Sequence, residues 1–440
     1  MRPATIAFLI LPLLGLAWAQ DGEINGADTA WMLISTALVL FMTPALAFFY
    51  GGLVRQKNVL NTMMMSLAAI ATAGVAWAVV GYSLSFGGSG GFIGGLMYSF
   101  ADGIDLGPQD GLGFPELLFL AYQGTFAIIT TAILTGSIVD RMRFGPLLVF
   151  LTLWSLLVYA PIAHWVWGGG FLGAMGALDF AGGTVVHVNA GIAGLVAAWV
   201  LGSRREWGHQ ALLPHNVPFT ILGAALLWLG WFGFNGGSAF GANETAALAL
   251  VNTMLAPAAT LLVWMILDYW RTGQATAVGA ATAIVVGLVA VTPAAGFVGP
   301  ASALAIGAIA AFPSYFLIMW RSGTGLDDSL DVFAAHGIGG ATGALLTGVF
   351  AQSIWNSAGS GALDGNWGQV WIQVQTIVVA GAYSAVATGG LLWIIGRFAP
   401  LRASPEEESL GMDVTQHGEE AYGSGEGAIL VIEEERGTRK

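Results

Sequence analysis

Cysteine is absent from this chain of 440 residues, and charged residues make up only 9% of it. Without thiols the chain has no disulfides, thiolate zinc sites or iron–sulfur clusters, so any chemistry must come from histidine, carboxylates, hydroxyls and aromatic rings. The scarcity of charge, with 56% hydrophobic residues and a mean hydropathy of +0.74, excludes an ordinary soluble globular protein. The composition predicts an all-α polytopic membrane protein.

Apolar runs of about 20 residues predict eleven membrane spans. These expected spans lie at roughly 29–50, 60–83, 115–138, 145–163, 183–202, 216–235, 245–269, 275–293, 301–320, 332–351 and 371–396. The net charge of −12 lies almost entirely outside them, which argues against binding of nucleic acid. We expect a multi-pass protein of the cell membrane.

Positive charge is missing from every second connection between the expected spans. After Arg2, lysine and arginine occur in the connections that follow odd-numbered spans and in the C-terminal tail, and none follows spans 2, 4, 6, 8 or 10. Under the positive-inside rule this places the N-terminus outside and the C-terminus in the cytoplasm. A miscounted span would break the alternation, so the charges support eleven spans independently of hydropathy.

The two ends of the chain differ from the apolar middle. Residues 1–19 combine one arginine, a short apolar run and a small-residue site, which predicts a cleavable signal peptide; a retained amphipathic anchor is the alternative. Residues 28–396 form the predicted transmembrane domain, and residues 397–440 form an acidic cytoplasmic tail. The part of the tail from Gly411 to Tyr422 is either a short docking element or a solvated segment.

Two stretches bring ionisable residues into apolar surroundings, where they are costly. The first runs from Asp179 to His187, and its counterpart runs from Asp331 to His336. Each histidine is followed by glycine at +4 and +7, namely Gly191 and Gly194 after the first, and Gly340 and Gly343 after the second. The two stretches begin spans 5 and 10, so they predict that spans 1–5 and 6–10 form an inverted repeat around a pore.

Of six histidines, His187 and His336 alone lie inside expected spans, and their matched settings favour a functional pair. Two imidazoles can share a proton or bind a small polar solute while staying neutral overall. Metal binding is the rival chemistry, but two histidines and Asp179 fall short of a catalytic metal site. Asp179 itself could cap the start of span 5 or form part of a vestibule that attracts cations.

Aromatic side chains gather toward the predicted outer face. Trp167 lies at the end of span 4, Phe126 lies in span 3, and Ser238 follows the end of span 6. Tryptophan at a span end is usually an interfacial residue. Together, however, these three side chains could hold a small cation through cation–π attraction and one hydroxyl acceptor.

At these residues the chain resembles the ammonium transporter superfamily (Amt/Mep/Rh), and in particular its bacterial and archaeal Amt branch. The resemblance covers about residues 28 to 422. The motifs that carry it are Phe49-Tyr50-Gly51-Gly52-Leu53-Val54, Gln123-Gly124-Thr125-Phe126-Ala127, Pro161-Ile162-Ala163-His164-Trp165-Val166-Trp167-Gly168, the stretch from Asp179 to His187, the stretch from Gly230 to Ser238, and the stretch from Asp331 to His336.

The resemblance implies a role for each of these side chains. Phe126, Trp167 and Ser238 match the family's external ammonium site, with Asp179 as the essential carboxylate near it. Phe126 and Phe234 match a stacked phenyl gate below that site. The pore-lining residues of the family are matched by His187, His336 and Trp231.

The resemblance also implies the function and the partners. We expect recruitment of ammonium, with methylammonium as an analogue, loss of its proton near the gate, and passage of ammonia with the proton, making transport electrogenic. The family forms homotrimers, and the segment from Gly411 to Tyr422 resembles the region that docks the P-II signalling protein. No cofactor and no enzymatic activity are implied. The alternatives are an electroneutral ammonia channel, an ammonium sensor on the same scaffold, and an intramembrane metal enzyme.

Overall fold

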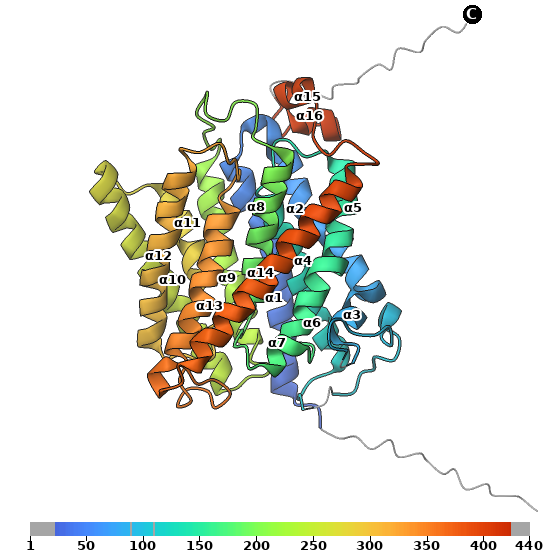
Figure 1. Ribbon diagram of the computed structural model, residues 1–440, viewed down its shortest axis with the longest axis vertical. Helices are drawn as coiled ribbons and strands as arrows, with labels where there is room; N and C mark the ends of the chain where they lie inside the picture. The colour runs from blue at the N-terminus through green and yellow to red at the C-terminus, as the bar shows by residue number, and fades with distance from the viewer. Residues whose placement is uncertain (1–22, 89, 109–110, 424–440) are drawn as a thin grey trace, which may run out of the picture.

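The computed structural model describes residues 23–88, 90–108 and 111–423, and this part of the chain is a bundle of helices without a β-strand (Figure 1). The expected signal peptide and the last residues of the tail lie outside the described residues. The long helices are α1 (Gly26–Leu53), α2 (Val59–Ala76), α4 (Glu116–Thr135), α5 (Phe144–Trp154), α8 (Asn189–Leu201), α9 (Val217–Gly237), α10 (Glu244–Thr272), α11 (Ala277–Val291), α12 (Pro300–Arg321), α13 (Gly339–Phe350) and α14 (Gly368–Ile395).

Shorter segments extend several of these helices. Four are π-helical turns, at Trp77–Gly81, Ser155–Tyr159, Gly183–Val188 and Phe333–Ile338. The others are α3 (Tyr82–Phe86), α6 (Ala160–Val166), α7 (Phe171–Ala174), α15 (Pro405–Leu410), α16 (Met412–His417) and the 3₁₀ turns Gln56–Asn58, Ser99–Ala101 and Ala362–Asp364. Through these extensions, α2 and α3 form one continuous rod, and so do α5 and α6.

Every expected span has a helical counterpart. Ten helical segments of the described residues are long and apolar enough to cross a membrane, which makes the chain a multi-pass membrane protein. The eighth expected span corresponds to α11, which has only 15 residues and is followed by a turn at Pro293. A proline cannot donate the next helical hydrogen bond, so the helix ends there. The last span, α14, has 28 residues and runs obliquely across the bundle, as its length predicts.

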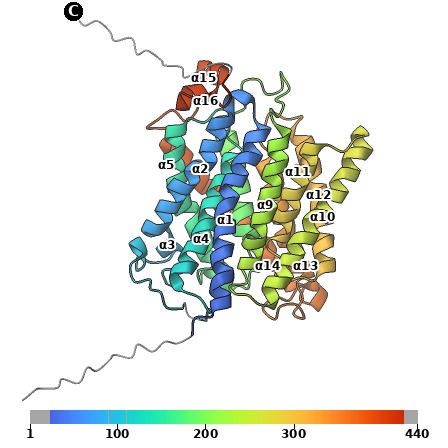
Figure 2. The same cartoon turned by 180° about the vertical axis from the view of Figure 1, so that it is seen from behind.

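Glycine brings α1 and α9 into close contact along their length (Figure 2). A methyl group on Gly223 would overlap the backbone of Phe49, and one on Gly233 would lie 2.7 Å from Cβ of Leu38. Small residues allow this approach, which stabilises helix pairs in lipid through van der Waals contact.

The two helices that carry the pore histidines cross in the same way. Gly191 lies against the backbone of Gly337, and Gly340 lies against Gly183 and His187. Because residue numbers rise along one helix as they fall along the other, the two helices run antiparallel. Both histidines lie in π-helical turns, which often occur at functional sites.

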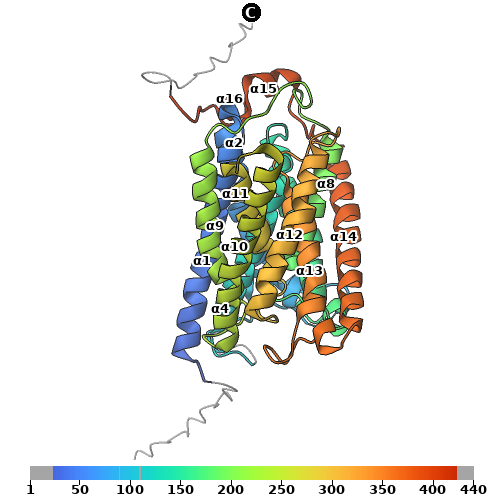
Figure 3. The same cartoon turned by 90° about the vertical axis from the view of Figure 1, so that its left-hand side faces the viewer.

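The described part of the tail packs on the end of the bundle opposite to the start of α1 (Figure 3). Ser404 and Glu407 form a capping box at α15. The carboxylate of Asp413 in α16 accepts hydrogen bonds from the backbone amides of Leu60 and Asn61, at the start of α2. The segment from Gly411 is therefore docked on the bundle in this structure.

Candidate functional site

A cavity of about 310 Å³ opens at the end of the bundle where α1 begins. The lining includes all four side chains expected to bind substrate there, Phe126, Trp167, Asp179 and Ser238. The rings of Phe126 and Trp167 meet at 89°, with their centroids 6.0 Å apart. This corner of aromatic surface is suited to a small cation.

Ser238 supplies a hydroxyl oxygen at the same cavity. The hydroxyl donates to the carbonyl of Phe234 at 2.9 Å and lies 3.3 Å from the hydroxyl of Tyr122. Tyr122 in turn lies within hydrogen-bond distance of the carbonyls of Gly233 and Phe234. Tyr122 is not among the site residues predicted from the sequence, although it lies directly before the motif that starts at Gln123.

Asp179 lines the cavity, but backbone amides occupy its carboxylate. One oxygen accepts from Gly182 and Gly183 at 2.8 and 2.6 Å, and the other accepts from Thr184 and Val185 at 2.8 and 3.1 Å. A carboxylate at a helix start is favourable because the free amides and the helix dipole point toward it. Of the two interpretations left open by the sequence, the geometry favours the helix cap.

The main chain of Asp179 also positions the tryptophan. Its carbonyl accepts a hydrogen bond of 2.9 Å from Nε1 of Trp167. The carboxylate therefore fixes the loop, and the loop fixes the ring of Trp167 at the cavity. These hydrogen bonds connect Asp179 to the position of the Trp167 ring.

Below the cavity, two phenyl rings lie between it and the histidines. Phe126 and Phe234 stack with centroids 4.3 Å apart and an interplanar angle of 30°. Both side chains are buried, and the ring of His187 stacks on the inner side of Phe234 at 6.0 Å. A molecule that passes between the outer cavity and the histidines must displace these rings.

The two histidines face each other across the crossing of their helices. Nδ1 of His187 lies 3.2 Å from Nδ1 of His336. With both rings neutral, one of these nitrogens donates and the other accepts, so the two rings share one proton at this contact. The ring that donates at Nδ1 has a bare Nε2, and the other ring carries a proton at Nε2. The pair thus offers one acceptor and one donor at its outer nitrogens.

The chamber beside the histidines holds about 10 Å³, which is room for a single small molecule. Nε2 of His187 is buried and has no hydrogen-bond partner within the described structure. Trp231 stacks on His187 at 5.4 Å, and its Nε1 donates to the hydroxyl of Thr292 at 2.9 Å. The remaining wall is apolar, formed by Met42, Leu46, Ile129, Ile133, Leu227 and Val285.

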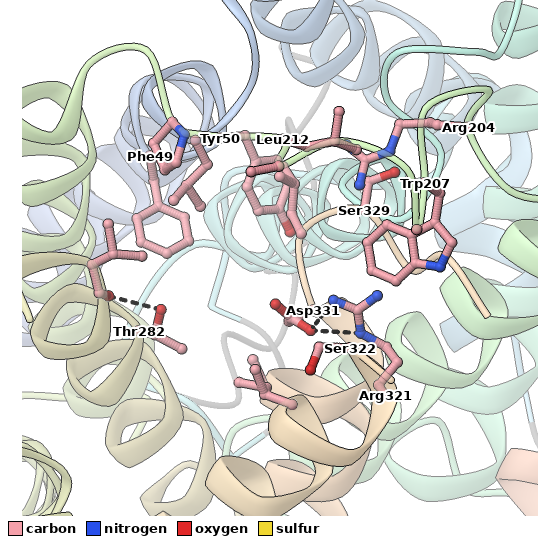
Figure 4. Close-up of a pocket in the computed structure, with 18 of the residues that line it drawn as sticks. Phe49, Tyr50, Arg204, Trp207, Leu212, Thr282, Arg321, Ser322, Ser329 and Asp331 are labelled. Atoms are coloured by element: carbon pink, nitrogen blue, oxygen red, sulfur yellow. Dashed lines mark hydrogen bonds and ion pairs between the residues drawn. The ribbon is translucent and has the colours of Figure 1, made fainter. Parts of the chain in front are cut away.

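A second cavity, of about 620 Å³, opens at the other end of the bundle and reaches His336 (Figure 4). We call it the inner vestibule. Arg204, Trp207, Arg321, Ser329 and Asp331 contribute polar groups to its wall. The two histidines therefore lie between an outer and an inner cavity, and the rings of Phe126 and Phe234 lie between the outer cavity and His187.

Buried ion pairs fix the wall of the inner vestibule. Arg204 binds Asp327 through two nitrogens at 2.8 Å and lies 3.2 Å from Asp140. Burial alone would raise the pKa of Asp327, but the hydrogen bonds and charge of Arg204 hold it below its usual value. Although a quarter of the Asp331 side chain is exposed, burial of the rest raises its pKa to about 6, against the opposing charge of Arg321.

Near His336 the residue that corresponds to Asp179 is Asp328, and not Asp331 as the sequence suggested. Asp179 lies eight positions before His187, and Asp328 lies eight positions before His336. Asp328 accepts a hydrogen bond of 2.7 Å from the amide of Phe333, at the start of the second π-helical turn. Asp331 instead pairs with Arg321 and faces the inner vestibule. The spacing of eight residues could have identified Asp328.

Among the described residues, no group of three or more His, Asp or Glu side chains is arranged to hold a metal ion. The two histidines contact each other through nitrogen atoms, and their surroundings supply aromatic and aliphatic groups. Such a wall suits a small neutral molecule that can exchange hydrogen bonds with imidazole.

Comparisons with known proteins agree with this arrangement. Residues 30–422 match the model of the Ammonium Transporter Family. An ammonium transporter of Aquifex aeolicus is 49% identical over 96% of this chain and 100% of its own. The crystal structure of Mep2 from Candida albicans has a TM-score of 0.84 and 36% identity, covering 91% of each chain. A structure described as a sensor Amt protein has a TM-score of 0.83 and 30% identity, covering 89% of this chain and 98% of its own.

Proposed function

The chain belongs to the ammonium transporter family, and from that premise we propose that it captures ammonium at the outer cavity, separates it from its proton and conducts ammonia past the histidine pair. The observation that carries the proposal is the contact of 3.2 Å between the two imidazoles, beside a chamber of about 10 Å³. In the membrane, eleven spans with an outside N-terminus would place the outer cavity outside the cell.

Selection against potassium follows from the chamber. Potassium resembles ammonium in size and charge, so an aromatic corner with one hydroxyl can hold either ion. The chamber offers no ring of oxygens to replace the hydration shell of an ion. A bare cation would therefore pay a large desolvation cost there. Ammonium can avoid that cost by giving up its proton.

The proton has a route of its own in this proposal. We place the shared proton on Nδ1 of His187 at the start, because Nε2 of that ring is buried without a partner. Ammonium gives a proton to this bare Nε2, and the proton at Nδ1 of that ring moves to Nδ1 of His336. Nε2 of His336 then releases its proton to water in the inner vestibule, which His336 lines. Each ring gains one proton and loses one, so one positive charge crosses while the ammonia passes as a neutral molecule. Both rings end in the opposite tautomer and must return to the first one before the next proton crosses.

Two further parts of the proposal concern assembly and regulation. We infer a homotrimer with one pore in each subunit, and a P-II protein as the partner of the segment from Gly411 to Tyr422. A sensor role is a second candidate because of the likeness to the sensor Amt protein. Deletion of residues 403–440 separates these roles, because a transporter keeps its uptake without the tail and a sensor loses its signalling partner.

The outer site is tested by the exchange Trp167→Leu. Because a cation–π contact contributes roughly 1–2 kcal/mol when desolvated, we expect the apparent KM for methylammonium uptake to rise by about tenfold, with a smaller change in maximal rate. The measurement is uptake of labelled methylammonium into proteoliposomes. Trp371→Leu is the matched control because that tryptophan is 63% exposed on α14 and is not among the residues that line the cavity. Equal KM values for the two variants would remove Trp167 from the site.

A further inference from the structure

The inner vestibule holds a carboxylate that the transport route described above does not use. Asp331 and His336 both line this cavity, so a molecule that leaves the histidine pair enters a space that contains the Asp331 side chain. In Figure 4 one oxygen of Asp331 is joined to Arg321, and the other points toward the open centre of the cavity. The free oxygen faces the route by which ammonia would leave.

Arg321 holds this carboxylate in place from one side. Nε and one terminal nitrogen of Arg321 both contact Oδ1 of Asp331 at 2.7 Å. Asp331 itself has a left-handed backbone conformation, with φ of 58°, which aspartate tolerates better than most residues. The side chain is thus positioned by an ion pair and a specific turn, and Oδ2 takes no part in that ion pair.

The other charged groups of the wall are already engaged. Arg204 is bound by Asp327 and Asp140. The ring of Trp207 lies 4.9 Å from the guanidinium of Arg321 and 5.8 Å from that of Arg204. Both arginines are therefore bound to carboxylates and lie against an aromatic ring. Oδ2 of the Asp331 carboxylate is left available to a ligand.

The two ends of the pore differ in whether a carboxylate oxygen is available to a cation. Four backbone amides occupy the carboxylate of Asp179 at the outer cavity, so a cation there is left with the aromatic rings and the hydroxyl of Ser238. At the inner end, Asp331 lies in a cavity twice as large and is 25% exposed. A cation can contact a carboxylate oxygen directly at the inner end.

We propose that Asp331 forms an inner cation site, at which ammonium is held after ammonia has regained a proton in the vestibule. The proposal rests on the proposed transport of ammonium. The bound species is a small monovalent cation with N–H donors, and the free oxygen of Asp331 accepts one of them. This site binds ammonium that arrives from the cytoplasm as well as ammonium that is about to leave.

The test uses the sidedness of the site. The full chain is reconstituted in two populations of proteoliposomes, one with the tail outside and one with the tail inside, sorted by protease access to the tail. Ammonium is then applied to the bath. In the tail-out population D331N is expected to raise the apparent KM for ammonium by about tenfold, which corresponds to about 1.4 kcal/mol. In the tail-in population the KM is expected to stay at the wild-type value.

Matched variants separate the site from the fold. D331E keeps the charge and is expected to keep the low KM in the tail-out population. The double variant D331N/R321Q removes the arginine that D331N leaves unpaired, and it is expected to keep the raised KM. E206Q is the control, because Glu206 is also a cytoplasmic acid paired with an arginine, Arg55, but does not line the vestibule.

Three results would overturn the inner site. The first is a KM for D331N that is unchanged in both populations. The second is an equal loss of transport in both populations for D331N and D331E, which would make Asp331 a structural residue. The third is recovery of the wild-type KM in the double variant. Failure of the proposed function itself would look different, since the wild-type protein would then transport no ammonium in either population.

Discussion

Ammonium transport is expected to fall at least a hundredfold when both pore histidines are replaced, in the variant His187→Leu, His336→Leu. Leucine is close to histidine in size, so the chamber keeps its shape while it loses both nitrogen atoms at the contact of 3.2 Å. Ammonium then has no acceptor for its proton, and the cost of moving the charged species through an apolar passage is several kcal/mol or more. Each 1.36 kcal/mol added to the barrier slows passage about tenfold.

The measurement is uptake of labelled methylammonium and of ammonium into proteoliposomes. His215→Leu serves as the control because His215 lies in a connection between helices and lines neither the chamber nor the outer cavity nor the inner vestibule. Thermal unfolding of both variants in detergent shows whether the bundle is intact. Ammonium uptake at the wild-type rate in a folded double variant would refute the role of the histidine pair.

The second large effect is expected for Gly191→Ala. The added methyl group would overlap the backbone of Gly337, at the crossing of the two histidine helices. Backbone cannot move aside as a side chain can, so the helices must separate, and a strained or repacked crossing of this kind costs roughly 1–3 kcal/mol or more. We expect a clear fall in melting temperature together with loss of transport, because the separation of the histidines depends on this crossing.

The matched variant is Gly390→Ala in α14. A methyl group there meets nothing within 4 Å, and alanine favours a helix over glycine by about 1 kcal/mol in soluble helices. The two variants should therefore change the melting temperature in opposite directions, or the control should leave it unchanged. If Gly191→Ala melts at the wild-type temperature and transports normally, the close crossing does not set the geometry of the histidine pair.

Much of this architecture can be predicted from the sequence because the membrane imposes simple rules. The lengths of the apolar runs located the helices to within a few residues. For α11 the hydropathy extended to residue 293, but the helix ends before Pro293 because proline interrupts the backbone hydrogen bonds. The matched settings of His187 and His336 indicated a pair, and the structure brings their rings into contact.

Other features depend on atoms whose positions the sequence does not specify. The sequence left the role of Asp179 open between a helix cap and a cation site, and only the four amide contacts favour the cap. The π-helical turns around both histidines have no recognised pattern in the sequence. The free oxygen of Asp331 depends on the direction from which Arg321 approaches, which is a matter of tertiary packing.

In the proposed transport, charge crosses with ammonium although the pore excludes bare cations. The most direct measurement is the current recorded from proteoliposomes on addition of ammonium, with potassium present as the competitor. We predict a current that depends on ammonium concentration, that persists in about tenfold excess of potassium, and that potassium alone does not produce. Uptake of ammonium without any current, or a comparable current carried by potassium, would contradict the account.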